Sequence, residues 1–218
     1  MTTILLLIRH GQTAWNRTDR FRGHADLPLD EVGMAQAEAT GRYIARFWNP
    51  AAVYAGPLSR TMKTAEPTAR HFGLPVVAET SLIDVDCGQW QGLTLEEARL
   101  RWPEEADQWL HAPEKLRFPG GETLEQARQR AMTFVKTLPA RHPEQAVVLV
   151  SHTALNRLIL LSTLGLGVGQ LWSLRQDTCC VNVIEVQQGH FTIVTMNSTA
   201  HLSTLEFERD SNEKTATV

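Results

Sequence analysis

The chain has 218 residues, of which 43% are hydrophobic and 21% are charged, and its formal net charge is -3. This composition is typical of a folded globular domain and excludes the collagen-like and strongly disordered classes. A net charge so close to zero gives no general attraction to nucleic acid or to an anionic membrane, so we expect neither as a partner. Any anion site must therefore come from a local cluster of arginine or histidine.

Cysteine usage favours a reducing compartment. Cys87, Cys179 and Cys180 cannot all pair within one chain, and their spacing fits no common metal motif. We therefore expect free thiols and a cytoplasmic location. The apolar run at 4–8 is too short to span a bilayer and has no basic leader, so it is predicted to be the first strand of the fold.

Strands and helices are predicted to alternate along most of the chain. Three short apolar runs each end in a polar cluster, at 4–8, 51–54 and 147–150. Such continuous runs are typical of strands buried on both faces of a parallel sheet. Helical patterns follow these runs, at 31–47, 59–72 and 153–164. We therefore predict an α/β fold with three α/β/α layers and a mostly parallel sheet.

The segment at 94–120 differs from the rest of the chain. Its charged residues alternate with spaced leucine and tryptophan, and Pro103 and Pro113 break it. We interpret it as a helical cap inserted over the sheet, followed by a long amphipathic helix. The tryptophans, Trp109 and Trp172 among them, are expected to pack the core and the cap.

The end of the chain is predicted to form a hairpin and a tail. Apolar and polar residues alternate on both sides of Gln188 and Gly189, which is a hairpin signal. Beyond it the chain becomes polar. We expect a single domain over 1–205 and a polar C-terminal tail over 206–218.

Arginine and histidine follow the predicted strands at the point where each strand ends. In open α/β sheets, ligands bind in the crevice at the carboxyl ends of the strands. The residues there are Arg9, His10, Arg60 and His152. A phosphoryl group suits such a set, because guanidinium groups bind its oxygens in pairs and a neutral imidazole can attack its phosphorus. One histidine at a strand end is usually a surface or core residue, but three strand ends with the same chemistry indicate a phosphoryl site.

The motifs around these residues resemble a known family. The run LLLIRHGQTAWN at 5–16 resembles the signature of the histidine phosphatase superfamily, also called phosphoglycerate mutase-like, in which RHG follows the first strand. GPLSRTMKTA and VVLVSHT resemble its second arginine motif and its second histidine motif, although Gly56 stands where a serine is frequent. The resemblance covers about 4–165, and the combination of motifs is specific.

The resemblance assigns roles by position. It implies that His10 is the phosphorylated nucleophile. The side chains that would bind the phosphoryl oxygens are Arg9, Arg60 and His152. Further candidates for binding the substrate are Asn16, Thr13, Arg22 and His201. Positive neighbours would keep His10 unprotonated and nucleophilic, and they would stabilise charge on the transferring group. No HExxH motif or clustered carboxylate set appears, so we expect no metal and no other cofactor.

The proton donor is where the chain departs from the family pattern. LIDVDCGQWQG resembles a segment in which a glutamate donates the proton, and Asp84 occupies that position. Aspartate is one methylene shorter than glutamate, and its reference pKa is ~3.9 against ~4.3. Asp86 would share a face with Asp84 in an extended segment and is the reserve candidate, although a solvated carboxylate is the commoner role for such a residue.

Three functions are compatible with these motifs. We expect a phosphomonoester hydrolase that acts on a small phosphorylated metabolite, because the cap segment is compact. A 2,3-bisphosphoglycerate-dependent mutase uses the same phosphohistidine but usually carries longer insertions. A phosphate-binding protein without turnover is the third reading, and retention of His10 argues against it. A homodimer is left open.

Overall fold

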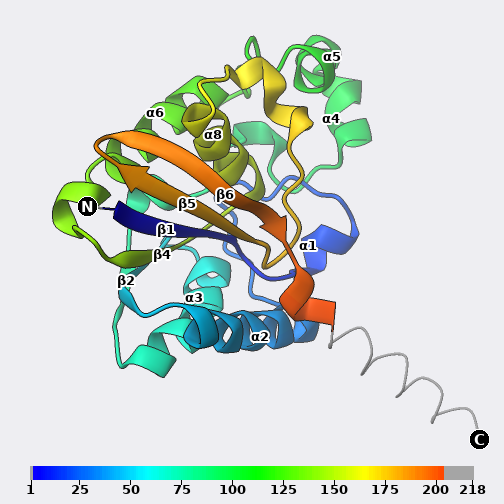
Figure 1. Cartoon of the computed structure of the whole chain (residues 1–218). Coiled ribbons are helices and arrows are strands. Elements are labelled where there is room, and N and C mark those ends of the chain that lie inside the picture. Colours follow the sequence, from blue (N-terminus) through cyan, green and yellow to red (C-terminus); the bar gives the residue numbers. More distant parts are fainter. Residues whose placement is uncertain (1, 204–218) are drawn as a thin grey trace, which may run out of the picture.

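The structure is a computed structural model, and it describes residues 2–203. The predicted tail at 206–218 and the domain boundary before it lie outside the described residues. The described chain forms three layers, with helices on both faces of one sheet (Figure 1). The predicted three-layer α/β/α fold is confirmed.

One sheet of six strands runs through the centre in the order β3-β2-β4-β1-β5-β6. The strands are β1 (Thr2–Arg9), β2 (Pro50–Ala55), β3 (Val76–Ala78), β4 (Ala146–Ser151), β5 (Val181–Gln187) and β6 (His190–Ser198). The first four strands pair in parallel, whereas β5 is antiparallel to β1 and β6 to β5. The mostly parallel sheet and the C-terminal hairpin are therefore as predicted.

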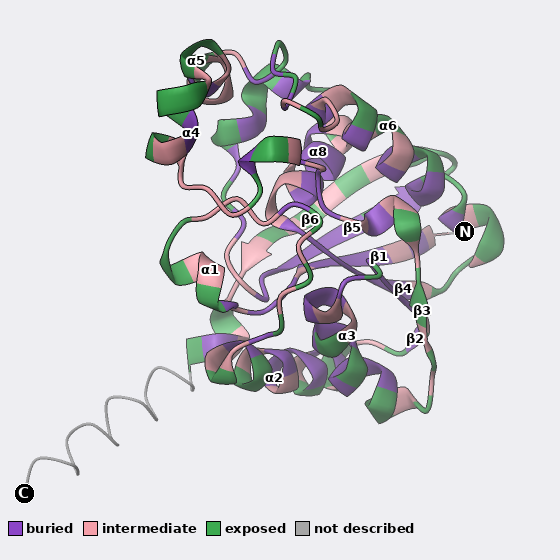
Figure 2. Ribbon diagram, turned by 180° about the vertical axis from the view of Figure 1, so that it is seen from behind, coloured by how far each residue is buried: buried purple, intermediate pink, exposed green. Residues whose placement is uncertain are grey.

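Strand β1 explains why a continuous apolar run appears in the sequence. Successive side chains of a strand point to opposite faces of the sheet. Leu5 and Leu7 enter one hydrophobic cluster, while Leu6 and Ile8 enter the other. Both faces are covered, so most side chains of the central strands are apolar and buried (Figure 2), and the polar ones among them, such as Thr3 and Asn182, are buried as well.

Four long helices cover the two faces of the sheet (Figure 1). They are α2 (Glu31–Phe47), α3 (Ser59–Phe72), α6 (Leu124–Val135) and α8 (Thr153–Thr163). Helices α2 and α3 pack together on one face, and α6 and α8 pack together on the other. Helix α2 begins where the Asp30 side chain accepts from the backbone N–H of Gly33, and α3 ends at Gly73, whose φ of 64° suits glycine.

The segment interpreted as a cap forms two short helices, α4 (Leu95–Arg101) and α5 (Pro103–His111). They lie beyond one end of α8, away from α2 and α3 (Figure 1). Thr94 and Glu97 form a capping box at the start of α4, and Pro103 begins α5. The remaining elements are α1 (Ala14–Arg17), α7 (Leu138–Arg141), η1 (Thr80–Leu82), η2 (Gly88–Trp90), η3 (Val168–Ser173) and η4 (Ala200–Leu202). None of the helices within residues 2–203 has the length and apolar character needed to cross a membrane.

Candidate active site

The parallel strands bring the two predicted histidines together. His10 follows the last residue of β1, and its backbone N–H donates to the carbonyl of Ser151, the last residue of β4, at 2.9 Å. His152 comes next on that neighbouring strand and immediately precedes α8. The ring centroids of His10 and His152 lie 5.2 Å apart, so the two imidazoles face one crevice at the end of the sheet.

The surroundings of His10 fix which of its nitrogens is free. Nδ1 lies 2.7 Å from the carbonyl oxygen of Gly11, which accepts hydrogen bonds only, so Nδ1 carries the proton. Nε2 then holds the lone pair, and it is buried without a hydrogen-bond partner in the described residues. The ring therefore presents one unprotonated nitrogen to the crevice.

His152 is held in the opposite tautomer. The Nε–H of Arg60 donates to Nδ1 of His152 at 3.3 Å, so Nε2 of His152 carries the proton. That N–H is also buried without a partner among residues 2–203. Arg60 is fully buried and also donates to the carbonyls of Ala25 and Gly23 at 2.7 and 2.9 Å. The crevice thus contains the unprotonated Nε2 of His10, which can accept a hydrogen bond, and the protonated Nε2 of His152, which can donate one.

Burial and charge keep both rings neutral. Burial, followed by the nearby His152 and Arg60, lowers the pKa of His10 well below its usual value. Burial, followed by Arg60 and Arg22, lowers the pKa of His152 in the same direction. Both imidazoles are therefore uncharged at neutral pH, and the free nitrogen of His10 has the lone pair that a nucleophile requires.

Two further arginines, Arg9 and Arg22, form no ion pair with an acidic residue of the described part of the chain. Arg9 donates from Nη1 to the carbonyl of Gln176 at 2.7 Å, and the Nε groups of Arg9 and Arg22 are buried without a partner in the described residues. Burial, together with the charge of Arg22, lowers the pKa of Arg9 to about 10. Like charges held this close favour a bound anion.

Asp84, rather than Asp86, lies at this crevice. Oδ2 of Asp84 is 3.3 Å from Nη2 of Arg60 and 3.5 Å from Nδ1 of His152. Asp86 instead accepts from the backbone N–H of Gly88 at 2.9 Å and stabilises that turn. The segment that carries the two residues belongs to no strand of the sheet, and the hydrogen bonds of the two carboxylates differ.

An unpredicted arginine holds the loop that carries Asp84. Arg130, on α6, donates to the carbonyls of Ser81, Ile83 and Asp84, each at 2.9 Å. It also pairs with Glu122 at 2.7 Å, and Glu122 accepts from the backbone N–H of Asp86 at 2.9 Å. One guanidinium group therefore fixes the loop by three carbonyl contacts. No local pattern indicates this role, because Arg130 lies 46 residues from Asp84 in the sequence.

The remaining predicted substrate-binding residues have different surroundings. Oδ1 of Asn16 accepts from the backbone N–H and the hydroxyl of Thr13 at 2.9 and 2.8 Å. Asn16 lines the cleft beside Arg9 and Arg22, whereas Thr13 is fully buried beneath it. Thr13 therefore holds Asn16 in place, and Asn16 and Arg22 face the space in which a substrate would bind.

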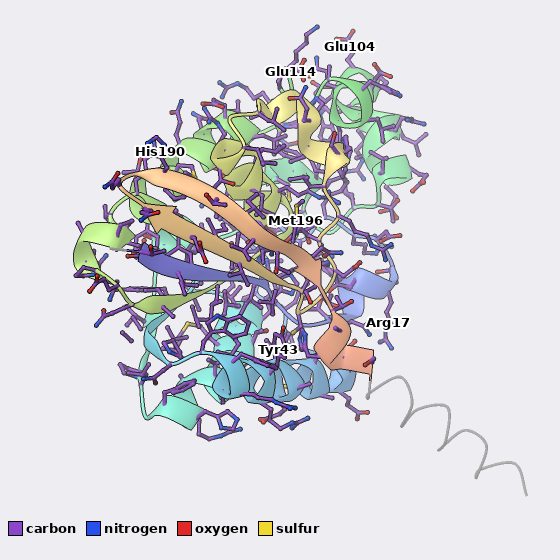
Figure 3. All side chains as sticks on the ribbon, viewed as in Figure 1. Arg17, Tyr43, Glu104, Glu114, His190 and Met196 are labelled. Carbon is purple, nitrogen blue, oxygen red and sulfur yellow. The ribbon has the colours of Figure 1, made fainter. Side chains whose placement is uncertain are left out.

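His201 is not brought to this cleft. It lies on η4, where its ring stacks on Tyr43 at 4.8 Å between centroids and its Nε2 is 3.0 Å from the hydroxyl of Thr40. Figure 3 labels Tyr43 on α2, the helix that η4 contacts. Neither Tyr43 nor Thr40 lines a cavity that contains Arg9 or Asp84. The structure thus places His201 in a packing contact with α2.

A cavity of about 320 Å³ extends from Asp84 toward the cap. The lining residues that were not predicted as site residues include Thr153, Arg157, Trp109 and Trp172. The hydroxyl of Thr153 is buried without a partner among residues 2–203. Trp109 and Trp172, expected to pack the core and the cap, also form part of the cavity wall. Thr153 follows His152 directly, so its proximity was readable from the sequence, whereas the tryptophans reach the site only through tertiary packing.

Gly56 lies behind His152. A Cβ atom there would be 2.6 Å from the carbonyl oxygen of Leu82 and 3.2 Å from Nε2 of His152. The first distance is shorter than packed atoms tolerate, and both neighbours are buried. A serine at this position, as is frequent in the family, would thus require the Leu82 backbone to move.

Comparison with known proteins decides the family. A model of the histidine phosphatase superfamily, branch 1, matches residues 5–199. The chain belongs to this superfamily. Phosphoserine phosphatase 1 of Hydrogenobacter thermophilus is 34% identical over 198 residues, which cover 91% of this chain and 93% of that protein. The structure of Bacillus stearothermophilus YhfR is similar with a TM-score of 0.87 and 29% identity, covering 92% of this chain and 99% of that chain.

A 2,3-bisphosphoglycerate-dependent phosphoglycerate mutase of Methylobacterium radiotolerans is also similar, with 33% identity over 187 residues that cover 82% of this chain and 87% of that protein. The superfamily therefore includes relatives of both enzymatic types. The likeness to phosphoserine phosphatase 1 extends over more of this chain and at slightly higher identity. The prediction of a phosphatase of the histidine phosphatase superfamily is confirmed.

Proposed function

We propose that the chain hydrolyses a small phosphomonoester in two steps through a phosphohistidine at Nε2 of His10. One observation carries the proposal: Nε2 of His10 is an unprotonated, buried nitrogen that has no hydrogen-bond partner among the residues the structure describes. The ring of His10 lies 5.2 Å from that of His152, measured between centroids, and three arginines are near it. A nucleophile is thereby held beside donors that suit a phosphoryl group.

In the first step, Nε2 of His10 attacks phosphorus, and the bond from phosphorus to the ester oxygen breaks. The Nε2–H of His152 and the free N–H groups of Arg9 and Arg22 donate to the phosphoryl oxygens. Asp84 gives its proton to the ester oxygen, which leaves as the alcohol. The positive groups stabilise the charge that develops on the transferring oxygens.

In the second step, water attacks the phosphohistidine. The carboxylate of Asp84 takes a proton from this water, the bond from nitrogen to phosphorus breaks, and inorganic phosphate leaves. Asp84 is then protonated again, and His10 returns to its starting tautomer because the carbonyl of Gly11 still holds its Nδ1–H. The same two side chains therefore complete the cycle.

The likeness to a mutase makes phosphoglycerate mutase the second candidate. The two activities differ only in what accepts the phosphoryl group from His10, which is water in a phosphatase and the bound product in a mutase. Following 3-phosphoglycerate by phosphorus NMR, with and without 2,3-bisphosphoglycerate, separates them. We expect phosphate release in both cases. Formation of 2-phosphoglycerate that depends on the bisphosphate and outpaces phosphate release would establish the mutase instead.

We also propose a cytoplasmic location. Cys87, Cys179 and Cys180 are all free thiols, and all are buried. Burial raises the pKa of Cys87 and Cys179 to about 12, so neither thiol is readily ionised. Unpaired thiols in this number are typical of proteins that work in a reducing compartment.

A further inference from the structure

One peptide unit links the nucleophile to helix α2. The peptide bond between Gly11 and Gln12 presents its carbonyl oxygen to Nδ1 of His10 at 2.7 Å and its N–H to Oε1 of Gln36 at 3.0 Å. A peptide group is planar and trans, so its C=O and N–H point in opposite directions and turn only together. The group that holds the N–H therefore also fixes the direction of the carbonyl.

The first turns of α2 hold the backbone of Gln12 in place. The backbone N–H of Asp30 donates to the carbonyl of Gln12 at 3.0 Å, and Oδ2 of Asp30 accepts from the side chain of Gln12 at 3.0 Å. Gly33 and Gln36 are three residues apart on α2 and thus on one helix face. A Cβ atom at Gly33 would lie 2.7 Å from the nitrogen of Gln12, so the helix backbone packs directly on this peptide unit.

The amide of Gln36 has a defined orientation. A backbone N–H only donates, so the Gln36 atom that faces Gln12 is the oxygen. The other amide atom, Nε2, donates to the hydroxyl of Thr178 at 3.0 Å. Two residues before Thr178, the carbonyl of Gln176 accepts from Nη1 of Arg9 at 2.7 Å. Gln36 thus connects the peptide behind the nucleophile to the segment that holds Arg9.

The direction of the Gly11 carbonyl decides which nitrogen of His10 is free. With the carbonyl oxygen 2.7 Å from Nδ1, a proton is required there, because two lone pairs at this distance would repel. If the peptide turned, the proton could move to Nε2 and occupy the lone pair that must attack phosphorus. Burial and the neighbouring positive charges keep the ring neutral, but they do not select between its two neutral tautomers.

We propose that Gln36 is a positioning residue that keeps the proton of His10 on Nδ1 by holding the peptide between Gly11 and Gln12. Gln36 lines neither of the cavities that contain Arg9 or Asp84, so it acts only through this peptide. The inference rests on the proposed function and adds what sets the nucleophile in its reactive tautomer. Without the Gln36 acceptor, part of the His10 population should carry its proton on Nε2, and that part cannot attack.

Nitrogen NMR of the free enzyme with isotope-labelled histidines tests the proposal at neutral pH, because couplings between ring nitrogens and ring protons distinguish the two tautomers. The His10 signals are those that disappear in His10→Ala. Gln36→Met removes the acceptor at similar volume, and Gln36→Asn is one methylene too short to reach. Gln36→Glu keeps an acceptor, and the hydroxyl of Thr178 can turn to donate to it. The control Gln12→Met removes the side-chain bond to Asp30 but leaves the peptide N–H.

We expect the Nδ1–H tautomer of His10 alone in wild type, Gln36→Glu and Gln12→Met, and a mixture of both tautomers in Gln36→Met and Gln36→Asn. In the last two variants, kcat/KM for p-nitrophenyl phosphate should fall about threefold to tenfold, as for the loss of one hydrogen bond. It should fall by the same factor as the Nδ1–H fraction of the free enzyme, because only that form reacts. A general distortion of the site would not produce this equality.

Several results would overturn the proposal. One is a lower kcat/KM in Gln36→Met while His10 stays wholly in the Nδ1–H form, since the loss would then be structural. Others are an unchanged tautomer and rate, unequal changes in the two quantities, or the same mixture in Gln12→Met or Gln36→Glu. If Gln36→Met does not fold, Gln36→Asn decides. The tautomer is measured without turnover, so a mixture in the Gln36 variants together with no phosphate label on His10 would refute the proposed function and leave the role of Gln36 standing.

Discussion

The substitution Asp84→Asn separates the chemical role of Asp84 from its structural role. Asparagine has the same shape and keeps an oxygen that can accept the 2.9 Å hydrogen bond from the backbone N–H of Val85. It removes the charge that faces Nη2 of Arg60 at 3.3 Å and Nδ1 of His152 at 3.5 Å. The side chain can also no longer take up a proton and pass it on.

The structural cost should be moderate. One hydrogen bond to a charged group is worth about 1.5 to 3 kcal/mol. Arg60 keeps its contacts to the carbonyls of Ala25 and Gly23 and to His152, so its charge is not left without partners. We therefore expect the free energy of unfolding to fall by about 1 to 3 kcal/mol, measured by urea titration, with the fold unchanged.

The chemical cost should depend on the leaving group. Alkoxides are poor leaving groups, so loss of the general acid should slow transfer from an alkyl phosphate by about 10² to 10⁴. The p-nitrophenolate ion leaves without a proton, so p-nitrophenyl phosphate should lose far less. The assay is a single-turnover rapid quench of His10 phosphorylation, because slow dephosphorylation hides the difference at steady state.

Two variants control this experiment. Asp84→Glu keeps the acid, and the adjoining cavity of about 320 Å³ has room for one methylene, so activity on alkyl phosphates should persist. Asp86→Asn makes the same change two residues on, where an asparagine oxygen can still accept from Gly88, and should have little effect. Equal losses on both substrates in Asp84→Asn would refute a general acid at this position, and a leaving-group effect in Asp86→Asn would move the role there.

Three further outcomes follow from the site. Below pH ~6.5, the unfolded state protonates His10 and His152 while the folded state keeps them neutral, so the free energy of unfolding should fall by up to about 1.4 kcal/mol per pH unit for each histidine. Urea titrations between about pH 5 and 7 should show that the free energy of unfolding depends less steeply on pH in His152→Asn than in wild type. The same pH dependence in both proteins would contradict a buried neutral ring at His152. Arg130→Met should lower kcat on alkyl phosphates by about tenfold to a hundredfold with little change in KM, because it releases the loop that carries Asp84. Arg130→Lys should recover part of this loss. A change in KM alone would argue against a role of Arg130 in positioning Asp84. Activity should survive EDTA, and loss with recovery on adding a divalent ion would oppose the metal-independent mechanism.

The sheet and its flanking helices were predictable from the sequence because both faces of the sheet are buried. Strands such as β1 then appear as continuous apolar runs, and helix α2 begins and ends at the predicted residues. The nearness of His10 and His152 follows from the same rule, since adjacent parallel strands end at one edge of the sheet. These parts depend on local pattern and on the geometry of parallel sheets.

The rest of the site depends on contacts between distant segments. Arg157 contacts Trp172 only because η3 folds back over α8. Arg130 contacts the loop of Asp84 although the cap segment separates the two residues in the sequence. His201 was expected to bind substrate, but the chain after β6 turns toward α2 and stacks it on Tyr43. No periodicity or spacing in the sequence encodes such packing.

The central claim is that Nε2 of His10 accepts the phosphoryl group. The direct measurement is to mix the enzyme with a phosphorus-labelled phosphomonoester, quench within one turnover, and locate the label by peptide mass spectrometry. We expect an acid-labile, alkali-stable phosphate on the peptide that contains His10, and neither label nor turnover in His10→Ala. A label on another residue, or turnover by His10→Ala, would contradict it.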